Sequence, residues 1–131
     1  MATFKEVEIY IRKNFKCREK EKGKENFISI VFAGDGRSQQ IICIGGRNEA
    51  MGEFLKVISP IGKISGKKLE KALEEAFECP LGGLVKLEDM IYLSTTIILE
   101  NVDENEIEHS LRGTAVIADK FEKELLGSDE F

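Results

Sequence analysis

The sequence predicts a single α+β domain in which an antiparallel sheet of five to six strands packs against three helices. Two patterns lead to this fold class. Apolar residues recur at helical spacing in three segments, and the stretches between them are β-prone runs joined by short turns. The expected order is α-β-β-(β-β)-α-β-β-α. The 131 residues suffice for one domain with a core, and no linker or repeat divides them, so residues 1–131 are expected to fold together.

The first helix is expected over about residues 3–14. Thr3 and Glu6 form a capping box, in which each side chain satisfies a backbone N–H at the helix start. The apolar stripe that follows contains Phe4, Val7, Tyr10, Ile11 and Phe15. The charged residues 16–26 fit either an edge strand with a turn near Gly23 or a loop, and the sequence leaves both open.

Three strands are expected next, over residues 27–33, 38–44 and 53–59. Gly34-Asp35-Gly36 predicts the turn between the first two. Gly45-Gly46 is expected to end the second strand, and Pro60 and Gly62 the third.

The second helix is expected over about residues 66–78, with Ser65 as its N-cap. Its apolar residues recur at spacings of three and four, which predicts one face turned toward a core. These residues are Leu69, Ala72, Leu73, Ala76 and Phe77.

A hairpin and a long helix form the last third. Residues 84–87 and 90–99 predict two strands, although Glu88-Asp89 lacks the glycine that a two-residue turn prefers, so a longer loop is expected. Asp103 is the expected N-cap of the final helix, and Gly127 its C-cap. Its buried stripe is expected to contain Ile107, Leu111, Thr114, Ala115, Ala118, Phe121 and Leu125.

Composition excludes several classes of function. The net charge of −5 argues against general nucleic-acid binding, which needs a basic surface. No apolar run approaches the roughly 18 residues of a membrane span, and no secretory signal is visible, so a cytoplasmic protein without membrane insertion is expected. Cys17, Cys43 and Cys79 are odd in number and widely spaced, which indicates reduced thiols.

No catalytic, cofactor or metal site is expected. His109 is the single histidine and lies on the polar side of the last helix. The acidic residues from Asp103 to Glu108 lack the glycine turn of a calcium loop and are explained by helix capping. Gly34-Asp35-Gly36 is flanked by predicted strands on both sides, and Gly45-Gly46 lacks the Lys-Ser/Thr of a phosphate loop, so both are expected to be turns.

The sequence instead favours a partner-binding surface. Three amphipathic helices and one sheet offer more apolar stripe than one core can hide. We expect the surplus on the first helix and the strand beside it, in grooves formed by Phe4, Val7, Tyr10, Ile11, Phe27, Ile28 and Ile30.

The element order resembles the type III secretion chaperone-like fold, and within it the YbjN-like bacterial proteins described as sensory transduction regulators. Residues 57–62 leading into the Leu69–Leu73 helix look like the family's strand-to-helix joint, residues 83–87 and 91–93 its second hairpin, and residues 118–122 its final helix. The resemblance implies a homodimer that binds a client polypeptide without catalysis. The alternative within the same scaffold is a regulator that senses a small ligand or modulates a signalling protein.

Overall fold

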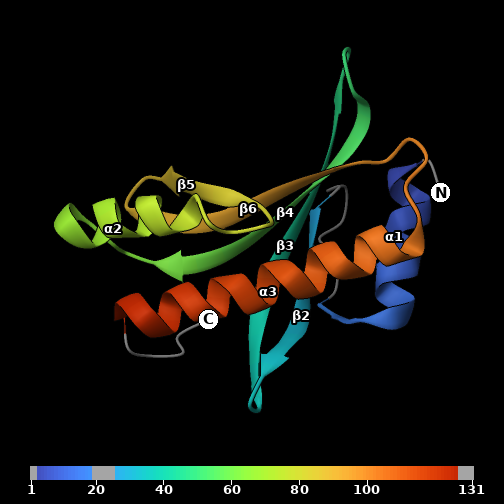
Figure 1. The fold of residues 1–131 in the computed structure, drawn as a ribbon. Helices are drawn as coiled ribbons and strands as arrows, with labels where there is room; N and C mark the ends of the chain where they lie inside the picture. Colours follow the sequence, from blue (N-terminus) through green and yellow to red (C-terminus); the bar gives the residue numbers. More distant parts are fainter. Residues whose placement is uncertain (1–2, 19–25, 127–131) are drawn as a thin grey trace.

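The computed structural model describes residues 3–18 and 26–126 and confirms the α+β class, with three helices and a six-stranded antiparallel sheet (Figure 1). The strands lie in the order β1-β2-β3-β4-β6-β5. The elements are α1 (Phe4–Asn14), β1 (Lys16–Cys17), β2 (Asn26–Gly34), β3 (Arg37–Asn48), β4 (Gly52–Gly62), α2 (Gly66–Ala76), β5 (Gly83–Leu87), β6 (Met90–Ile98) and α3 (Glu104–Leu126).

All three helices pack on the same face of the sheet. One core cluster joins α1 and the first half of α3 to β2, β3, β4 and β6. A second cluster joins α2 and the second half of α3 to the end of β4 and the start of β6. Because α3 takes part in both clusters, it is the element that unites the core, and it crosses the front of the sheet in Figure 1.

All three predicted helix starts are confirmed, and two of them have the expected side-chain cap. The Thr3 hydroxyl accepts a hydrogen bond from the Glu6 backbone N–H at 3.2 Å, and the Asp103 carboxylate accepts one from the Glu106 N–H at 2.8 Å. Ser65 was wrong as a side-chain cap: it stands at the N-cap position of α2 but makes no capping hydrogen bond. The proposed C-cap, Gly127, lies outside the described residues.

Gly45 and Gly46 do not end β3, which is a correction to the prediction. They pair with Leu55 and Phe54 of β4, and the strand continues to Asn48. A Cβ at Gly45 would lie 2.5 Å from the Phe4 ring, and one at Gly46 would lie 2.5 Å from the Phe54 ring. The two glycines are strand residues over which aromatic rings pack, so their small size serves contact with the rings.

The first half of β3 parts from the second half of β4. Their pairing runs from Asn48–Gly52 to Ile42–Ile58, and beyond that point β3 pairs with β2 alone and β4 with β6 alone. Buried Gln39 bridges the parting, because its Nε2 donates to the Pro60 carbonyl at 3.2 Å. Pro60 lacks an N–H and is tolerated in an interior strand because β3 no longer pairs with β4 at this position, and β4 continues to Gly62.

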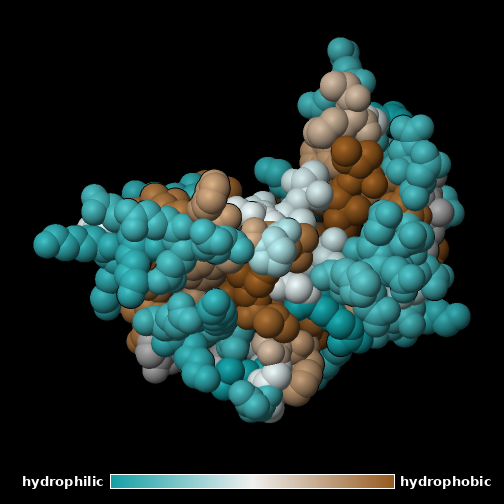
Figure 2. Space-filling model, viewed as in Figure 1, coloured by the Kyte–Doolittle hydropathy of each residue, from teal (hydrophilic) through white to brown (hydrophobic). Residues whose placement is uncertain are grey.

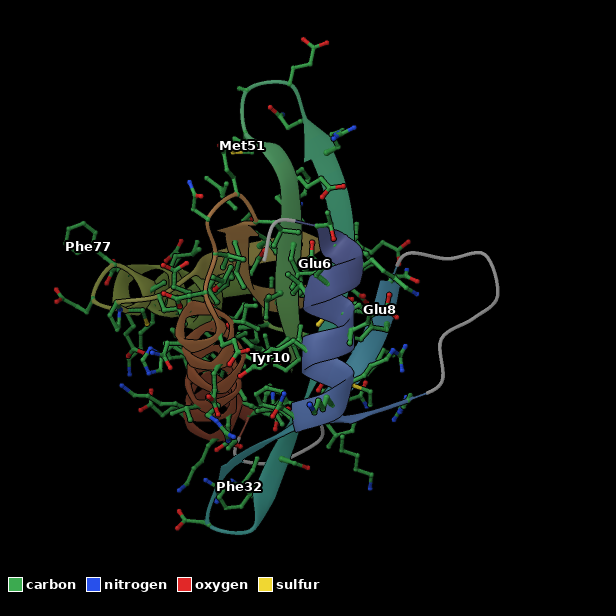
Figure 3. All side chains as sticks on the ribbon, turned by 90° about the vertical axis from the view of Figure 1, so that its right-hand side faces the viewer. Glu6, Glu8, Tyr10, Phe32, Met51 and Phe77 are labelled. Carbon is green, nitrogen blue, oxygen red and sulfur yellow. The ribbon has the colours of Figure 1, made fainter. Side chains whose placement is uncertain are left out.

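The predicted second helix is shorter than expected and buries fewer residues. It ends at Ala76, and Leu73 and Phe77 are 51% and 87% exposed. Phe77 projects away from the end of α2 in Figure 3. Only Ala72 is fully buried, with Leu69 and Ala76 packed at the margin of the core, so the expectation of a five-residue core face was wrong for Leu73 and Phe77.

The hairpin turn consists of Glu88 and Asp89 alone, since Leu87 pairs with Met90. The expectation of a longer loop was wrong because Glu88 adopts the left-handed conformation, with φ of 57°, that glycine usually supplies. The predicted parity of β6 is confirmed for Ile91, Leu93 and Ile97, which are buried.

The predicted stripe of α3 is buried throughout, and α3 is continuous through Gly113. Asp119 and Glu122 are buried beside it, which the sequence did not indicate. Arg37 at the start of β3 donates from Nε to both Asp119 oxygens at 3.1 Å and from a terminal nitrogen at 2.9 Å. This bidentate pair fixes α3 onto the sheet.

For residues 16–26 the sequence left an edge strand and a loop open, and the structure shows a short edge strand at the start of this segment. Lys16 and Cys17 pair with Ile30 and Ser29 of β2 as strand β1. The turn expected near Gly23 falls in residues 19–25, outside the described part of the chain.

Candidate functional site

Three of the predicted partner-binding residues are ordinary core. Val7 and Ile11 are 0% exposed and Phe27 is 4% exposed, all within the cluster beneath α1 and α3. A partner could not contact them in this conformation, so the placement of a binding groove on the α1 stripe is corrected. The first helix belongs to the core because Val7 and Ile11 pack in the same cluster as residues of α3 and of strands β2 to β4.

Phe4 and Tyr10 lie at the margin of the same cluster and are half-buried. The Phe4 ring packs over Gly45 and approaches the Phe27 ring at 6.1 Å between centroids. Burial, followed by the charges of Glu108 and Glu104 on α3, raises the pKa of Tyr10. Both aromatic side chains therefore serve the contact of α1 with its neighbours.

Ile28 and Ile30 lie on the opposite face of the sheet. Side chains alternate along β2, so these two point away from the buried Phe27, Ser29 and Val31. No helix of the described chain packs on this side, since the helices take part in clusters built from the other parity. We call it the open face.

The open face is apolar across five strands. Ile28, Ile42 and Ile58 lie in one row, because Ile28 pairs with Ile42 and Ile42 with Ile58. Register and alternation place further large side chains on this face; they are Ile30, Phe32, Ile44, Phe54, Val85, Leu87, Met90, Tyr92 and Ile98.

The open face leaves large apolar side chains in contact with solvent. Its exposed members are Phe32 at 59%, Val85 at 45%, Leu87 at 67% and Ile98 at 47%, and the half-buried isoleucines of β2, β3 and β4 lie on the same face. Exposed apolar side chains that share one face of a sheet are characteristic of an interaction site.

A hollow lies within the open face, with a volume of about 340 Å³. We call it the open-face hollow. Three isoleucines and Tyr92 form most of its apolar wall, and two lysines and a serine add polar groups. The lining residues are Ile42, Ile44, Lys56, Ile58, Val85, Lys86, Leu87, Tyr92 and Ser94.

Lys56 is the one charged residue that register places in the interior of the open face, among the described strands. It pairs with Ile44 of β3 and Thr96 of β6, and the neighbouring rows on this face contain Phe54 and Ile98 on one side and Ile42 and Ile58 on the other. Within the described residues no ion pair to Lys56 is formed, and its side chain is exposed. The open face thus combines a broad apolar surface with the positive charge of Lys56 in its interior and that of Lys86 at its edge strand.

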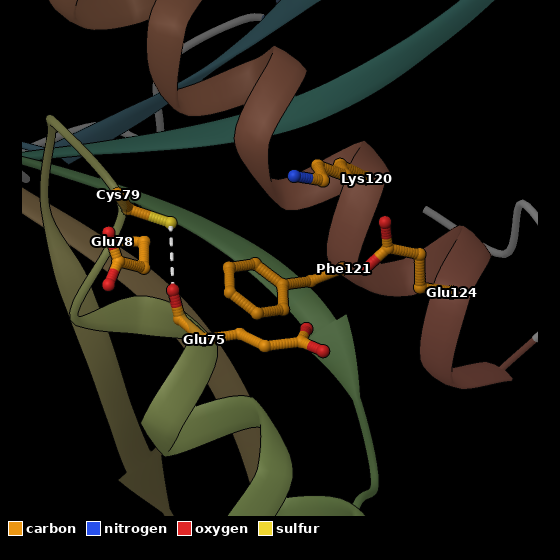
Figure 4. A pocket seen from close by; sticks show the side chains of 6 residues that line it. All are labelled: Glu75, Glu78, Cys79, Lys120, Phe121 and Glu124. Atoms are coloured by element: carbon orange, nitrogen blue, oxygen red, sulfur yellow. Dashed lines mark hydrogen bonds between the residues drawn. The ribbon is translucent and has the colours of Figure 1, made fainter.

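The helix side of the molecule has a different surface. Figure 2 shows hydrophilic side chains over most of this side, with apolar ones between the helices and along paired strands β3 and β4. A smaller hollow of about 210 Å³ lies between the end of α2 and α3 (Figure 4). Glu75, Glu78, Glu124 and Lys120 surround the Phe121 ring there, and the Cys79 thiol donates to the Glu75 carbonyl at 3.8 Å. These groups explain local packing and form no recognisable nucleophile–base pair.

The remaining candidate residues are dispersed. The three cysteines are free thiols, and burial raises the pKa of Cys17 and, more strongly, that of Cys43. His109 is exposed on α3. In residues 3–18 and 26–126, no group of three or more His, Cys, Asp or Glu is placed to hold a metal ion. None of the helices in the same ranges is both long and apolar enough to cross a membrane.

Known proteins add no assignment. Neither a protein-family model nor a curated protein matches this chain.

Sequence reasoning found two residues of the open face, Ile28 and Ile30, and missed the others. The signal was present in the strands 27–33 and 38–44, where both parities are apolar. A strand that is apolar on both sides needs cover on both sides. Counting the helices available for each face could have identified the uncovered one.

Proposed function

We propose that this protein binds polypeptides without catalysis and that its open face is the binding surface. The observation that carries the proposal is the contiguous apolar surface across β2 to β5, which no element of the described chain covers. An unstructured or extended client segment would contribute apolar side chains to this surface. The proposal keeps the chaperone-like or adaptor role that the resemblance implies and moves its site from the α1 stripe to the sheet.

The setting that fits this role is the cytoplasm, where free thiols such as Cys43 persist. The homodimer that the resemblance implies is part of the same proposal, and light scattering on the purified chain tests it. A strict monomer would contradict the dimer without affecting the proposed client site.

The test of client binding uses a fluorescently labelled, permanently unfolded model polypeptide and measures its affinity by anisotropy. Val85→Asp and Leu87→Asp place charges on the open face at side chains that are already 45% and 67% exposed, so the fold should tolerate them. We expect each to weaken binding at least tenfold. Ile9→Asp is the matched control, because Ile9 is 57% exposed on α1 and lies away from the open face. Equal affinity for all four proteins would contradict the proposal.

The open-face hollow favours a second candidate, a regulator that senses a small apolar ligand. Its volume of about 340 Å³ falls at the lower end of the range for small-molecule sites. A rise in melting temperature with a defined apolar compound, lost in Leu87→Asp, would support this function. If such a rise occurred without any affinity for unfolded polypeptide, the regulator would replace the client-binding proposal.

A further inference from the structure

The charge pattern of the open face defines the chemistry of its occupant. Lys56 lies between Ile44 and Thr96, one row from the apolar row of Ile42 and Ile58, and it also lines the open-face hollow. A partner that covers this face must therefore surround an ammonium group with protein. Burial of an unpaired charge is costly, whereas a carboxylate opposite it forms a charge-assisted hydrogen bond.

A second copy of the chain fits this requirement poorly. In a face-to-face dimer the same surface is present on both sides. Among the described strands, register places no carboxylate on the open face, whereas Lys56 lies in its interior and Lys86 of the edge strand β5 lines the same hollow. Such a dimer would bury two lysines without a partner for either, which disfavours self-association through this face.

We infer that the open-face hollow accepts one large apolar side chain of a partner polypeptide, and that Lys56 pairs with an aspartate or glutamate next to that side chain in the partner. This inference rests on the proposed function and specifies the partner's chemistry. Ile42, Ile58 and Tyr92 contact the apolar side chain of the partner, and Lys56 forms an ion pair with the aspartate or glutamate beside it. The site therefore prefers segments in which a bulky apolar residue and an acidic residue stand within about two positions.

A random peptide library displayed on phage, selected on the purified full chain, tests this preference. We expect selected peptides to share a large apolar residue with an acidic neighbour. In a synthetic copy of one such peptide, replacement of the acid by lysine should weaken binding to the wild-type chain at least tenfold. The same replacement should strengthen binding to Lys56→Glu, which restores an opposite charge. Lys67→Glu, an exposed lysine on α2, is the matched control and should bind as the wild type does.

The outcomes separate this inference from the proposed function. Peptides that lose affinity for Leu87→Asp but show no acidic preference, or whose binding is unchanged in Lys56→Glu, overturn the inference and leave the client-binding function intact. Peptides that bind Leu87→Asp as well as the wild type, or the absence of any selected peptide, overturn both. A dimer that Leu87→Asp converts to a monomer shows that a second copy occupies the face, and it also overturns the inference.

Discussion

The two faces of the sheet have similar apolar side chains and different surroundings. Ile41 and Cys43 of β3 are fully buried beneath helices, while Ile42 and Ile44 of the same strand lie on the open face. The difference arises because α1, α2 and α3 all return to one side of the sheet. The composition of a strand therefore shows that both of its faces are apolar. Which face the helices of the same chain bury depends on how the loops connect those helices to the sheet.

The largest expected contrast between the faces comes from two leucines in one hairpin. Leu93 of β6 is fully buried, so Leu93→Ala should lower the free energy of unfolding by about 2–5 kcal/mol. Leu87 of β5 is 67% exposed on the open face, so Leu87→Ala should change it by less than about 0.5 kcal/mol. Urea unfolding measures both. Similar losses for the two variants would mean that the open face is covered in the folded protein, as in a dimer.

Polar contacts also stabilise the covered face, and a buried ion pair there is expected to contribute more than an exposed one. Asp119 is buried against Arg37, so Asp119→Ala should cost about 1.5–3 kcal/mol by leaving the guanidinium without its bidentate acceptor. Glu108 pairs with Arg112 on the exposed side of α3 at 3.2 Å, and Glu108→Ala should cost less than about 1 kcal/mol. Denaturant unfolding of both variants measures the difference. Equal costs would show that the Arg37–Asp119 pair does not fix α3 to the sheet.

Two strand glycines differ in the space around them: Gly45 lies under a ring on the covered face, whereas Gly83 lies at the open edge of the sheet. Gly45→Ala places a methyl group 2.5 Å from the Phe4 ring and should cost about 1–3 kcal/mol. Gly83→Ala in β5 meets nothing within 4 Å and should change stability by less than about 0.5 kcal/mol. Thermal melts of the two variants provide the comparison. A neutral Gly45→Ala would indicate that α1 shifts easily on the sheet.

The smallest effect is a dependence on pH. Burial raises the pKa of the Cys43 thiol, so the folded chain holds this proton more tightly than the unfolded chain does. The resulting stability is complete below the unfolded pKa of about 8.5 and is lost as pH rises above it, by about 0.8 kcal/mol at pH 9. The unfolding free energy of the wild type should therefore fall relative to that of Cys43→Ala between pH 7 and 9. Parallel curves would contradict the buried thiol.

Local sequence signals predicted the element order because their physics is local. Thr3 and Asp103 cap helices through atoms three residues away, and the α3 stripe needs only helical periodicity. Gly45 misled the prediction because its role depends on Phe4, which lies far away in sequence. Likewise, Glu88 adopts a conformation that its residue type seldom indicates.

The candidate site was harder to predict for a related reason. The stripe containing Val7 and Ile11 is indistinguishable in sequence from an exposed one, since periodicity shows amphipathicity and not the identity of the covering element. Arg37–Asp119 joins residues 82 positions apart, and no spacing rule connects them. Ile28 and Ile30 were chosen for the wrong groove and lie instead on the open face.

The position of α3 after all six strands in chain order has a consequence for synthesis on the ribosome. This helix contacts β2, β3, β4 and β6, yet it follows every strand in chain order. A nascent chain that has emerged only as far as β6 exposes both sides of its sheet, because the main cover for one side has not been made. The interval before α3 emerges is thus the period in which the chain is most prone to aggregate, and co-translational chaperones would act there.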